Sequence, residues 1–459
     1  MAHTERAEAM SRGFRDSLPR QAGWGRYGKR PIWVLAGVAF IDSVDRGILP
    51  GVLTKVQDDL GFSDTRAGVL GTAFILAGFL VVLPSGYLAD RYRRTRIIAV
   101  VLATWGLISA LNAGVRSYWQ FLAVRATLGL GETIDNPASQ SLIADYYAPD
   151  IRGRAYGLQR VAPIVGVAVG TGVAGGVAAL LNWRWAFLLV GVPGSLLALA
   201  VWRLPEPHRG ESDGSDQWEP TLVPSTHPAV RTKGARALVA DALQAARVPS
   251  LRALMIGAAI ASGALGGLGF WAAAFYERHT TLGSGGGAGV AGVLILLGAL
   301  GGTWAGGVAT DRMRGRYEGA PMLIAGVTQF AGAALIMTTF LPVPLWYRLP
   351  GQLVSVALIV AGLPALTAMT SEVVSPAIRG IAFSVEGFLA AVATALSPLA
   401  IGVLADQFPI TVDGETKGHL ANAFLCVTPL VLVGALVVLA GRRHVGADVA
   451  RAAGRSVEA

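Results

Sequence analysis

The sequence has few residues of the types that carry out covalent or metal chemistry. A single cysteine, Cys426, among 459 residues excludes a disulfide framework or a cysteine metal site within one chain. The six histidines lie in termini, linker or loops, with His419 at the first position of the last apolar run, which gives no support to a metal site or to histidine catalysis inside a membrane. No phosphate-binding loop of the form Gly-x-x-x-x-Gly-Lys-Ser/Thr is present, so direct ATP hydrolysis is disfavoured. We expect neither an enzyme nor a bound cofactor.

Charged residues are scarce as well. They make up 15% of the chain against 53% hydrophobic residues, and the mean hydropathy is +0.53. This balance excludes a soluble protein of this size. The first 30 residues are polar and basic and lack the apolar stretch of a cleavable signal peptide, so we expect the first apolar run to act as the insertion signal. The sequence predicts a multi-pass integral membrane protein.

Twelve apolar runs of about 20 residues, the length that crosses a bilayer core, recur along the chain. Six lie in the first half, at about 32–54, 67–89, 97–115, 119–144, 155–180 and 185–204, and six in the second, at about 252–275, 287–309, 321–341, 347–370, 380–405 and 419–440. They predict an all-α membrane protein of two pseudo-symmetric six-helix bundles. Its parts are a tail (1–30), a bundle (31–204), a linker with a short amphipathic helix near 235–247 (205–249), a second bundle (250–440) and a tail (441–459).

The excess of basic residues follows the predicted topology. Of the 38 lysines and arginines, 28 fall in segments on the N-terminal side of the membrane, and seven fall in the opposite loops. Because basic residues are enriched in cytoplasmic loops, we expect both termini and the linker to be cytoplasmic, in a protein of the plasma (cytoplasmic) membrane. The net charge of +9 therefore reflects topology and does not indicate a nucleic-acid partner.

One motif occurs at equivalent points of the two halves. The run from Gly86 to Arg94 follows the second span, and the run from Gly307 to Arg316 follows the eighth. Both read Gly-x-x-x-Asp-Arg with further basic residues, and this resembles the cytoplasmic loop signature of the major facilitator superfamily, whose halves are parallel repeats. The sequence thereby predicts the major facilitator fold.

The same motif suggests a cytoplasmic gate. Glycine lets a neighbouring helix approach closely, and an aspartate can face the positive N-terminus of that helix, which would hold the cytoplasmic side shut. The arginines can alternatively serve only as topology determinants. The gate candidates are Gly86, Asp90, Arg91, Arg94, Gly307, Asp311 and Arg312.

Several ionisable residues fall inside predicted spans, where each costs at least about 2.5–3.5 kcal/mol on insertion scales. The first span holds Asp42, Asp45 and Arg46, with Arg46 placed to neutralise either carboxylate. The fourth holds Arg125, Glu132 and Asp135 along one stripe, the fifth Arg160 and the eleventh Glu386. Facing carboxylates and arginines can couple to protons, because the protonation of a carboxylate depends on its solvation and on a nearby arginine. The alternative is a static buried ion network that fixes helix packing.

A narrower resemblance covers residues 35–210. The runs 41–49, 86–94, 125–132, 143–145, 183–186 and 205–210 resemble the spinster family of lipid transporters. The resemblance implies proton-linked movement of lysophospholipids or sphingoid lipids, with Asp45, Arg46, Arg125 and Glu132 at the coupling positions. Asp42, Asp135 and Asn136 add polarity beyond the family pattern.

These features predict a monomeric secondary active transporter that moves a small amphipathic solute by rocking of its two halves, with a proton gradient as driving force. The cavity candidates are Asp42, Asp135, Asn136, Arg160, Phe40, Phe270, Trp271 and Glu386, although aromatic residues in spans can also be packing or interface anchors. The alternative is a drug/proton antiporter, suggested by the run from Ala162 to Gly166, or a transporter of another small organic solute.

Overall fold

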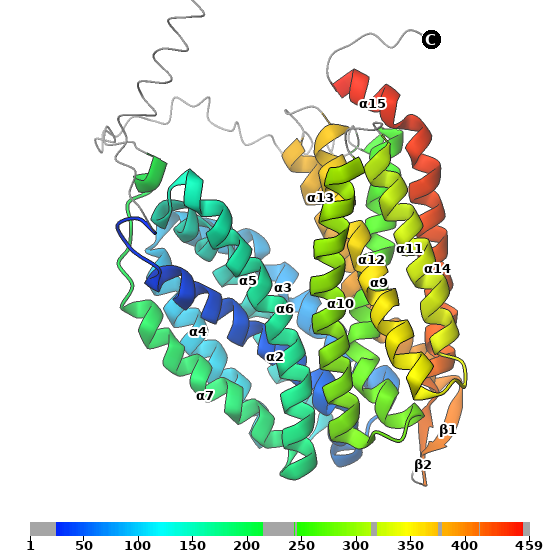
Figure 1. Cartoon of the computed structure of the whole chain (residues 1–459). Coiled ribbons are helices and arrows are strands. Elements are labelled where there is room, and N and C mark those ends of the chain that lie inside the picture. Colours follow the sequence, from blue (N-terminus) through cyan, green and yellow to red (C-terminus); the bar gives the residue numbers. More distant parts are fainter. Residues whose placement is uncertain are drawn as a thin grey trace, which may run out of the picture.

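The computed structural model describes residues 24–213, 243, 246–313, 319–374, 379–412 and 414–452, and this part of the chain contains twelve long helices in two halves (Figure 1). The N-terminal half is α2 (Arg30–Leu60), α3 (Asp64–Arg91), α4 (Arg94–Leu111), α5 (Tyr118–Tyr146), α6 (Pro149–Leu180) and α7 (Trp183–Trp202). The C-terminal half is α9 (Pro249–His279), α10 (Gly283–Met313), α11 (Ala320–Thr339), α12 (Leu345–Glu372), α13 (Arg379–Asp406) and α14 (Leu420–Gly441). Two bundles of six helices confirm the predicted fold class.

Judged by length and apolar composition alone, ten of these helices could cross a membrane. The two that are not, α2 and α5, are the helices that carry Asp42, Asp45, Arg125 and Asp135. Several helices also run past the predicted spans: α2 continues to Leu60, and α6 starts at Pro149. Hydropathy detects only the part of a helix inside the lipid, whereas the backbone hydrogen bonds continue into the interfacial layer.

Small residues bring helices into backbone contact both within and between the halves. A Cβ atom on Gly170 of α6 would lie 2.2 Å from the carbonyl oxygen of Val44 in α2. Between the halves, α3 packs on α13 and α6 on α10, and a Cβ atom on Gly68 would lie 2.5 Å from the carbonyl oxygen of Pro398. The same distance separates a Cβ on Gly292 from a backbone oxygen of α6. Such contacts permit only glycine at these positions.

The two ends of the molecule differ. At one end α13 and α14 are joined by an antiparallel hairpin of β1 (Pro409–Val412) and β2 (Glu415–Gly418), beside the start of α3, and we call this end the hairpin side. The opposite end, where α7 ends, α9 begins and α15 (Val445–Ala452) lies, is the linker side.

The hairpin was not predicted, although Asp413-Gly414 between two short β-prone runs is a turn signal, and Gly414 has a positive φ of 82°. The amphipathic helix predicted near 235–247 lies mostly outside the described residues.

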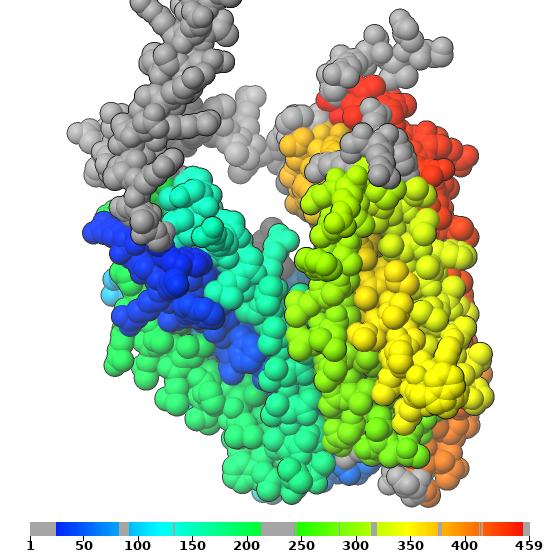
Figure 2. Space-filling model, in the orientation of Figure 1, coloured from blue at the N-terminus to red at the C-terminus, as the bar shows by residue number. Residues whose placement is uncertain are grey.

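The halves meet on the hairpin side and diverge toward the linker side. Figure 2 shows the molecule hollowed between them at the linker-side end. The structure therefore represents the state in which the central cavity is open toward the linker side and closed toward the hairpin side.

Candidate functional site

A large cavity of about 1250 Å³ lies between the two halves. Residues of both halves line it, so any rocking of one half against the other changes its shape. The two walls differ in chemistry. The N-terminal half contributes five ionisable side chains together with polar amides, and the C-terminal half contributes mainly aliphatic and aromatic side chains.

The charged wall is built from α2, α5 and α6. Its ionisable members are Asp42, Arg46, Arg125, Asp135 and Arg160, and Asn136, Gln140 and Gln159 lie among them. Arg46 forms an ion pair with Asp42 one helical turn away, with 3.5 Å between Nη2 and Oδ2. Asp135 of α5 lies near enough to interact electrostatically with both. Charges of both signs therefore face the cavity from one side.

A second ion pair lies behind this wall. Asp45 of α2 is fully buried, and its carboxylate accepts hydrogen bonds from Ser109 of α4 and, at 3.2 Å, from Arg125 of α5. Arg125 is 2% exposed and lies over the ring of Phe74, 4.7 Å from the ring centroid. Because Arg125 also lines the cavity, it connects the buried carboxylate to the cavity surface.

The predicted charged face of α2 is split in the structure. We expected Arg46 to neutralise either Asp42 or Asp45, but consecutive residues on a helix point about 100° apart, and Asp45 turns toward α4 and α5. Its partner is Arg125, while Arg46 pairs with Asp42. The predicted coupling residue Glu132 lies in α5, but its side chain is outside the described part of the structure.

Three of the predicted cavity residues lie elsewhere. Phe270 lines the cavity as predicted, but Phe40, Trp271 and Glu386 are not among the described lining residues. Phe40 packs against the core of the N-terminal half, and Trp271 is fully buried and donates its indole N–H to the carbonyl of Pro398 at 3.0 Å. Glu386 accepts a 2.7 Å hydrogen bond from Thr370 within the C-terminal half. Residue type and depth alone could not distinguish a cavity position from a packing position.

An inter-half ion pair joins the two halves on the hairpin side. Arg278, near the end of α9, donates two hydrogen bonds of 2.7 Å to the carboxylate of Asp64 at the start of α3. Both side chains are at most 2% exposed. Gln57 bonds to both partners, accepting from Arg278 at 2.9 Å and donating to Asp64 at 2.8 Å. A buried, bidentate pair of this kind is among the stronger polar contacts in proteins.

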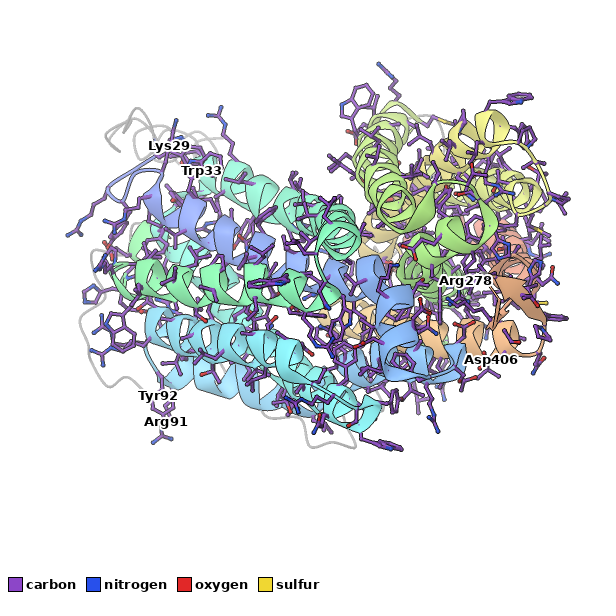
Figure 3. The ribbon with its side chains drawn as sticks, turned by 90° about the horizontal axis from the view of Figure 1, so that it is seen from below. Lys29, Trp33, Arg91, Tyr92, Arg278 and Asp406 are labelled. Carbon is purple, nitrogen blue, oxygen red and sulfur yellow. The ribbon has the colours of Figure 1, made fainter. Side chains whose placement is uncertain are left out.

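Further contacts from the C-terminal half reach the same place. The carboxylate of Asp406, at the end of α13, accepts hydrogen bonds from the backbone N–H groups of Asp64 and Thr65 and so caps α3 from the opposite half. Lys417 of the hairpin pairs with Asp58 at 2.7 Å. Figure 3, seen from the hairpin side, shows Arg278 and Asp406 in the region where the halves meet. The sequence prediction missed these contacts between the halves, because residues far apart in sequence form them and each alone looks like an ordinary loop charge.

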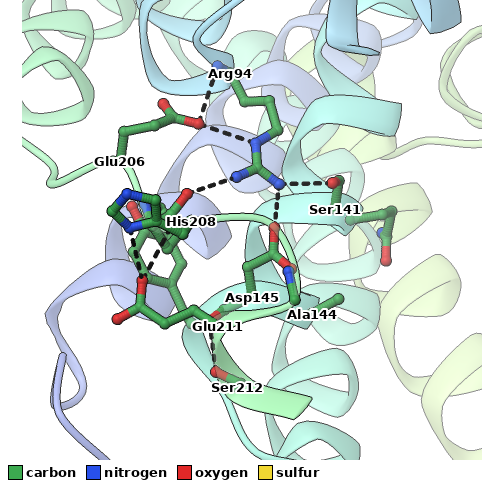
Figure 4. Close-up of polar contacts among 12 residues, drawn as sticks. Arg94, Ser141, Ala144, Asp145, Glu206, His208, Glu211 and Ser212 are labelled. Carbon is green, nitrogen blue, oxygen red and sulfur yellow. Dashed lines mark hydrogen bonds and ion pairs between the residues drawn. The ribbon is translucent and has the colours of Figure 1, made fainter. Parts of the chain in front are cut away.

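On the linker side, Arg94 of the repeated motif is a structural residue. It is 2% exposed and forms ion pairs with Asp145 of α5 and, at 2.9 Å, with Glu206 of the linker (Figure 4). It also donates to the hydroxyl of Ser141 and to the carbonyl of Pro207. Glu206 in turn caps α4 by accepting hydrogen bonds from the backbone N–H groups of Arg94 and Thr95. Arg94 thus holds the beginning of the linker against the N-terminal half.

Those of the other predicted gate residues that the structure describes are not buried between helices in this state. Arg91, Asp311 and Arg312 are exposed, and Figure 3 shows Arg91 at the outer edge of its half. Gly307 makes no close helix contact here, since a Cβ added to it would meet no described heavy atom within 4 Å, and it is Gly306 that packs tightly, on α12. The surroundings of Gly86 and the side chain of Asp90 lie outside the described part.

The Glu206 contacts predict a pH-dependent stability. Although burial by itself raises the pKa of Glu206, hydrogen bonds from Thr95 and Arg94 outweigh it and hold the pKa below its ordinary value. The carboxylate therefore stabilises the fold above its unfolded-state pKa, and this contribution is lost as the pH falls through the lower folded-state pKa. We expect Glu206→Gln to lower the free energy of unfolding by about 1–3 kcal/mol at neutral pH. Thermal unfolding of the detergent-solubilised parent and variant should show a difference that disappears in acid; an equal difference at every pH would contradict this role.

Comparisons with known proteins agree with this architecture. The sequence profile of the Major Facilitator Superfamily matches residues 35–363. Protein spinster of Drosophila melanogaster is 32% identical over 191 residues, covering 41% of this chain and 32% of that protein. A probable L-galactonate transporter of Escherichia coli (strain K12) is 32% identical over 166 residues, covering 36% of this chain and 37% of that protein. The chain thus aligns with only about a third of the length of these curated relatives.

Among solved structures, the chain is similar to a bacterial homolog of the human lysosomal transporter spinster in an inward-facing, unoccupied conformation. The TM-score is 0.79 at 20% identity, and the match covers 95% of this chain and 100% of the other. At this identity the likeness shows the shared fold and nothing about the solute.

Proposed function

Since this chain belongs to the major facilitator superfamily of membrane transporters, we propose that it is a proton-coupled secondary transporter of an amphipathic solute such as a lysophospholipid. The predicted superfamily and the likeness to spinster proteins are confirmed. The observation that carries the proposal is the cavity between the halves, which has charges of both signs on one wall and apolar side chains on the other. An amphipath with a charged head and an apolar tail matches both walls at once.

The side toward which the cavity opens can be assigned to one side of the membrane. Both ends of the described chain and the described beginning of the linker lie on the linker side. By the predicted topology, 28 of the 38 basic residues belong to segments on this side. Because basic residues favour the cytoplasmic side, we propose that the linker side is cytoplasmic and that this state is inward-facing. The inward-facing bacterial relative, which has the same fold, supports this orientation. We also propose that the protein works as a monomer, because one chain supplies all the residues that line the cavity.

For proton coupling, the proposal relies on Asp45 and Arg125. Arginine stays charged in proteins, so the carboxyl group is the member of the pair that can exchange a proton. A solute whose head bonds to Arg125 from the cavity would weaken the contact with Asp45 and so change the affinity of that carboxylate for a proton. Glu132 follows Arg125 by seven residues in α5, which places it two helical turns further along the same face. From this position in the sequence, we propose Glu132 as the second coupling group.

A small organic anion is the second candidate solute. Three arginines, Arg46, Arg125 and Arg160, line the cavity, and guanidinium groups bind carboxylates well. The likeness to a probable L-galactonate transporter points the same way. The apolar wall favours the amphipath, because a sugar acid would leave those side chains without a partner.

Transport into proteoliposomes with an imposed pH gradient tests the function. We expect uptake of a lysophospholipid to rise at least about tenfold when the gradient is present, whereas a sugar acid is not driven by it, since it has no apolar part to contact the second wall. Gradient-driven movement of a cationic dye in place of the lysophospholipid would favour the drug/proton antiporter. Vesicles without protein are the control. Gradient-driven uptake of the sugar acid alone would show that the solute is a small organic anion and not a lipid. Equal rates of lysophospholipid uptake with and without a gradient would exclude proton coupling.

A further inference from the structure

A polar pair lies within the apolar wall of the cavity. Tyr276 of α9 donates its hydroxyl hydrogen to the side-chain carbonyl of Gln352 of α12. The two residues are 1% and 6% exposed, and both line the cavity. Their neighbours along this wall are apolar, among them Phe275, Phe340 and Phe424. A buried tyrosine and glutamine facing each other in such surroundings need a reason beyond packing, because apolar residues of the same size would pack there without loss.

The amide nitrogen of Gln352 supplies that reason. In the described part of the chain it has no hydrogen-bond partner. A primary amide carries two N–H donors, and leaving a buried donor unpaired costs about 1–3 kcal/mol. Tyr276 donates to the carbonyl end of the amide, which leaves the nitrogen as the end without a partner. The side chain is therefore held with its donor end unsatisfied, at a position that lines a cavity large enough for a solute.

The opposite wall holds unpaired polar atoms as well. The side-chain carbonyl of Gln159 and the Nε of Arg125 have no hydrogen-bond partner among the described residues, and both residues line the cavity. Unpaired groups on both walls of one cavity are the mark of a site that a ligand completes. A solute that reaches from Arg125 to Gln352 would satisfy polar groups of both halves and contact the apolar side chains between them.

We propose that Tyr276 and Gln352 form a subsite for a hydrogen-bond acceptor oxygen, a hydroxyl or carbonyl, carried on the apolar part of the solute. This inference rests on the proposed function for the placement of the charged head at the N-terminal wall. It narrows the solute class from any amphipath to one with an oxygenated tail. Gln352 acts as a specificity residue: a plain hydrocarbon tail leaves its amide unpaired, whereas an oxygenated tail accepts from it.

The test compares matched lipids in a binding measurement that does not depend on transport. Stearoyl lysophosphatidylcholine and isomers with one hydroxyl at successive tail positions are titrated onto the full-length protein in detergent. We expect at least one isomer to bind the parent about tenfold more tightly than the plain lipid, corresponding to roughly one hydrogen bond. In Gln352→Met, which keeps the length of the side chain, this preference should disappear while the plain lipid still binds.

Thr394→Val provides the matched control. Thr394 also lines the cavity, but its hydroxyl already donates to the carbonyl of Ala390, so its loss should leave the tail preference unchanged. The comparison is a ratio within each variant and therefore does not depend on the yield of folded protein. A parent that binds all tails equally, or a Gln352→Met variant that keeps the preference, overturns the subsite. Failure of transport with the preference intact would reject the transport proposal and keep the subsite.

Discussion

Replacing Asp45 by asparagine should reduce uptake driven by a pH gradient by at least about tenfold, and this is one of the two largest effects that we expect. The side chain is fully buried and paired with Arg125, and removing one member of a buried pair typically costs 3–5 kcal/mol. Asparagine preserves the shape and the contact with Ser109 but cannot exchange a proton. Uptake in proteoliposomes with and without the gradient measures the loss.

Two further measurements separate a coupling role from a folding role. Exchange of labelled for unlabelled solute without a gradient should persist in Asp45→Asn, since binding does not require the proton. Ser109→Ala is the matched control, because it removes one hydrogen bond to the same carboxylate, worth about 1 kcal/mol, and leaves the ion pair in place. If Asp45→Asn transports with the same pH response as the parent, Asp45 is not the coupling group and the pair is a static packing element.

Most of the fold could be predicted because lipid imposes a simple rule on the sequence. A spanning helix must be long and apolar, and twelve such runs were visible. The rule is weakest where function departs from it: α2 and α5 carry so much charge that composition alone does not mark them as spans. They were predicted as spans because each still reads as an apolar run of about 20 residues between more strongly charged segments. The hairpin at 409–418 was missed because it is short and lies outside the membrane rule.

The site was predictable only where charge at membrane depth marked it. Asp42, Arg46, Arg125 and Asp135 line the cavity because a charge in lipid is tolerated only when it faces water or a partner. Trp271 shows the limit, since an aromatic residue is stable both at a cavity and in a core, and its burial depends on Pro398 of a distant helix. Likewise Arg278 and Asp64 meet only after the two halves have packed.

The second large effect that we expect concerns this inter-half pair. Arg278→Ala should shift the protein toward the state that is open on the hairpin side, by at least about 100-fold in the ratio of the two states. The reason is that the bidentate pair with Asp64 crosses between the halves only when that side is closed, and breaking a buried pair costs about 3–5 kcal/mol. Distances between spin labels placed across each side, measured by pulsed electron paramagnetic resonance, give the ratio.

Comparison with a neighbouring ion pair tests whether the burial of the Arg278–Asp64 pair is what keeps the hairpin side closed. Lys417 and Asp58 also join the halves on the hairpin side at 2.7 Å, but Asp58 is 34% exposed, and exposed pairs contribute only about 0–1 kcal/mol. Lys417→Ala should therefore change the ratio by less than about fivefold. Arg278→Lys should fall between the two, because lysine keeps the charge and loses the bidentate geometry. Equal shifts in Arg278→Ala and Lys417→Ala, or no shift in either, would mean that the backbone contacts of α3 with α13 close this side and that the ion pair only follows them.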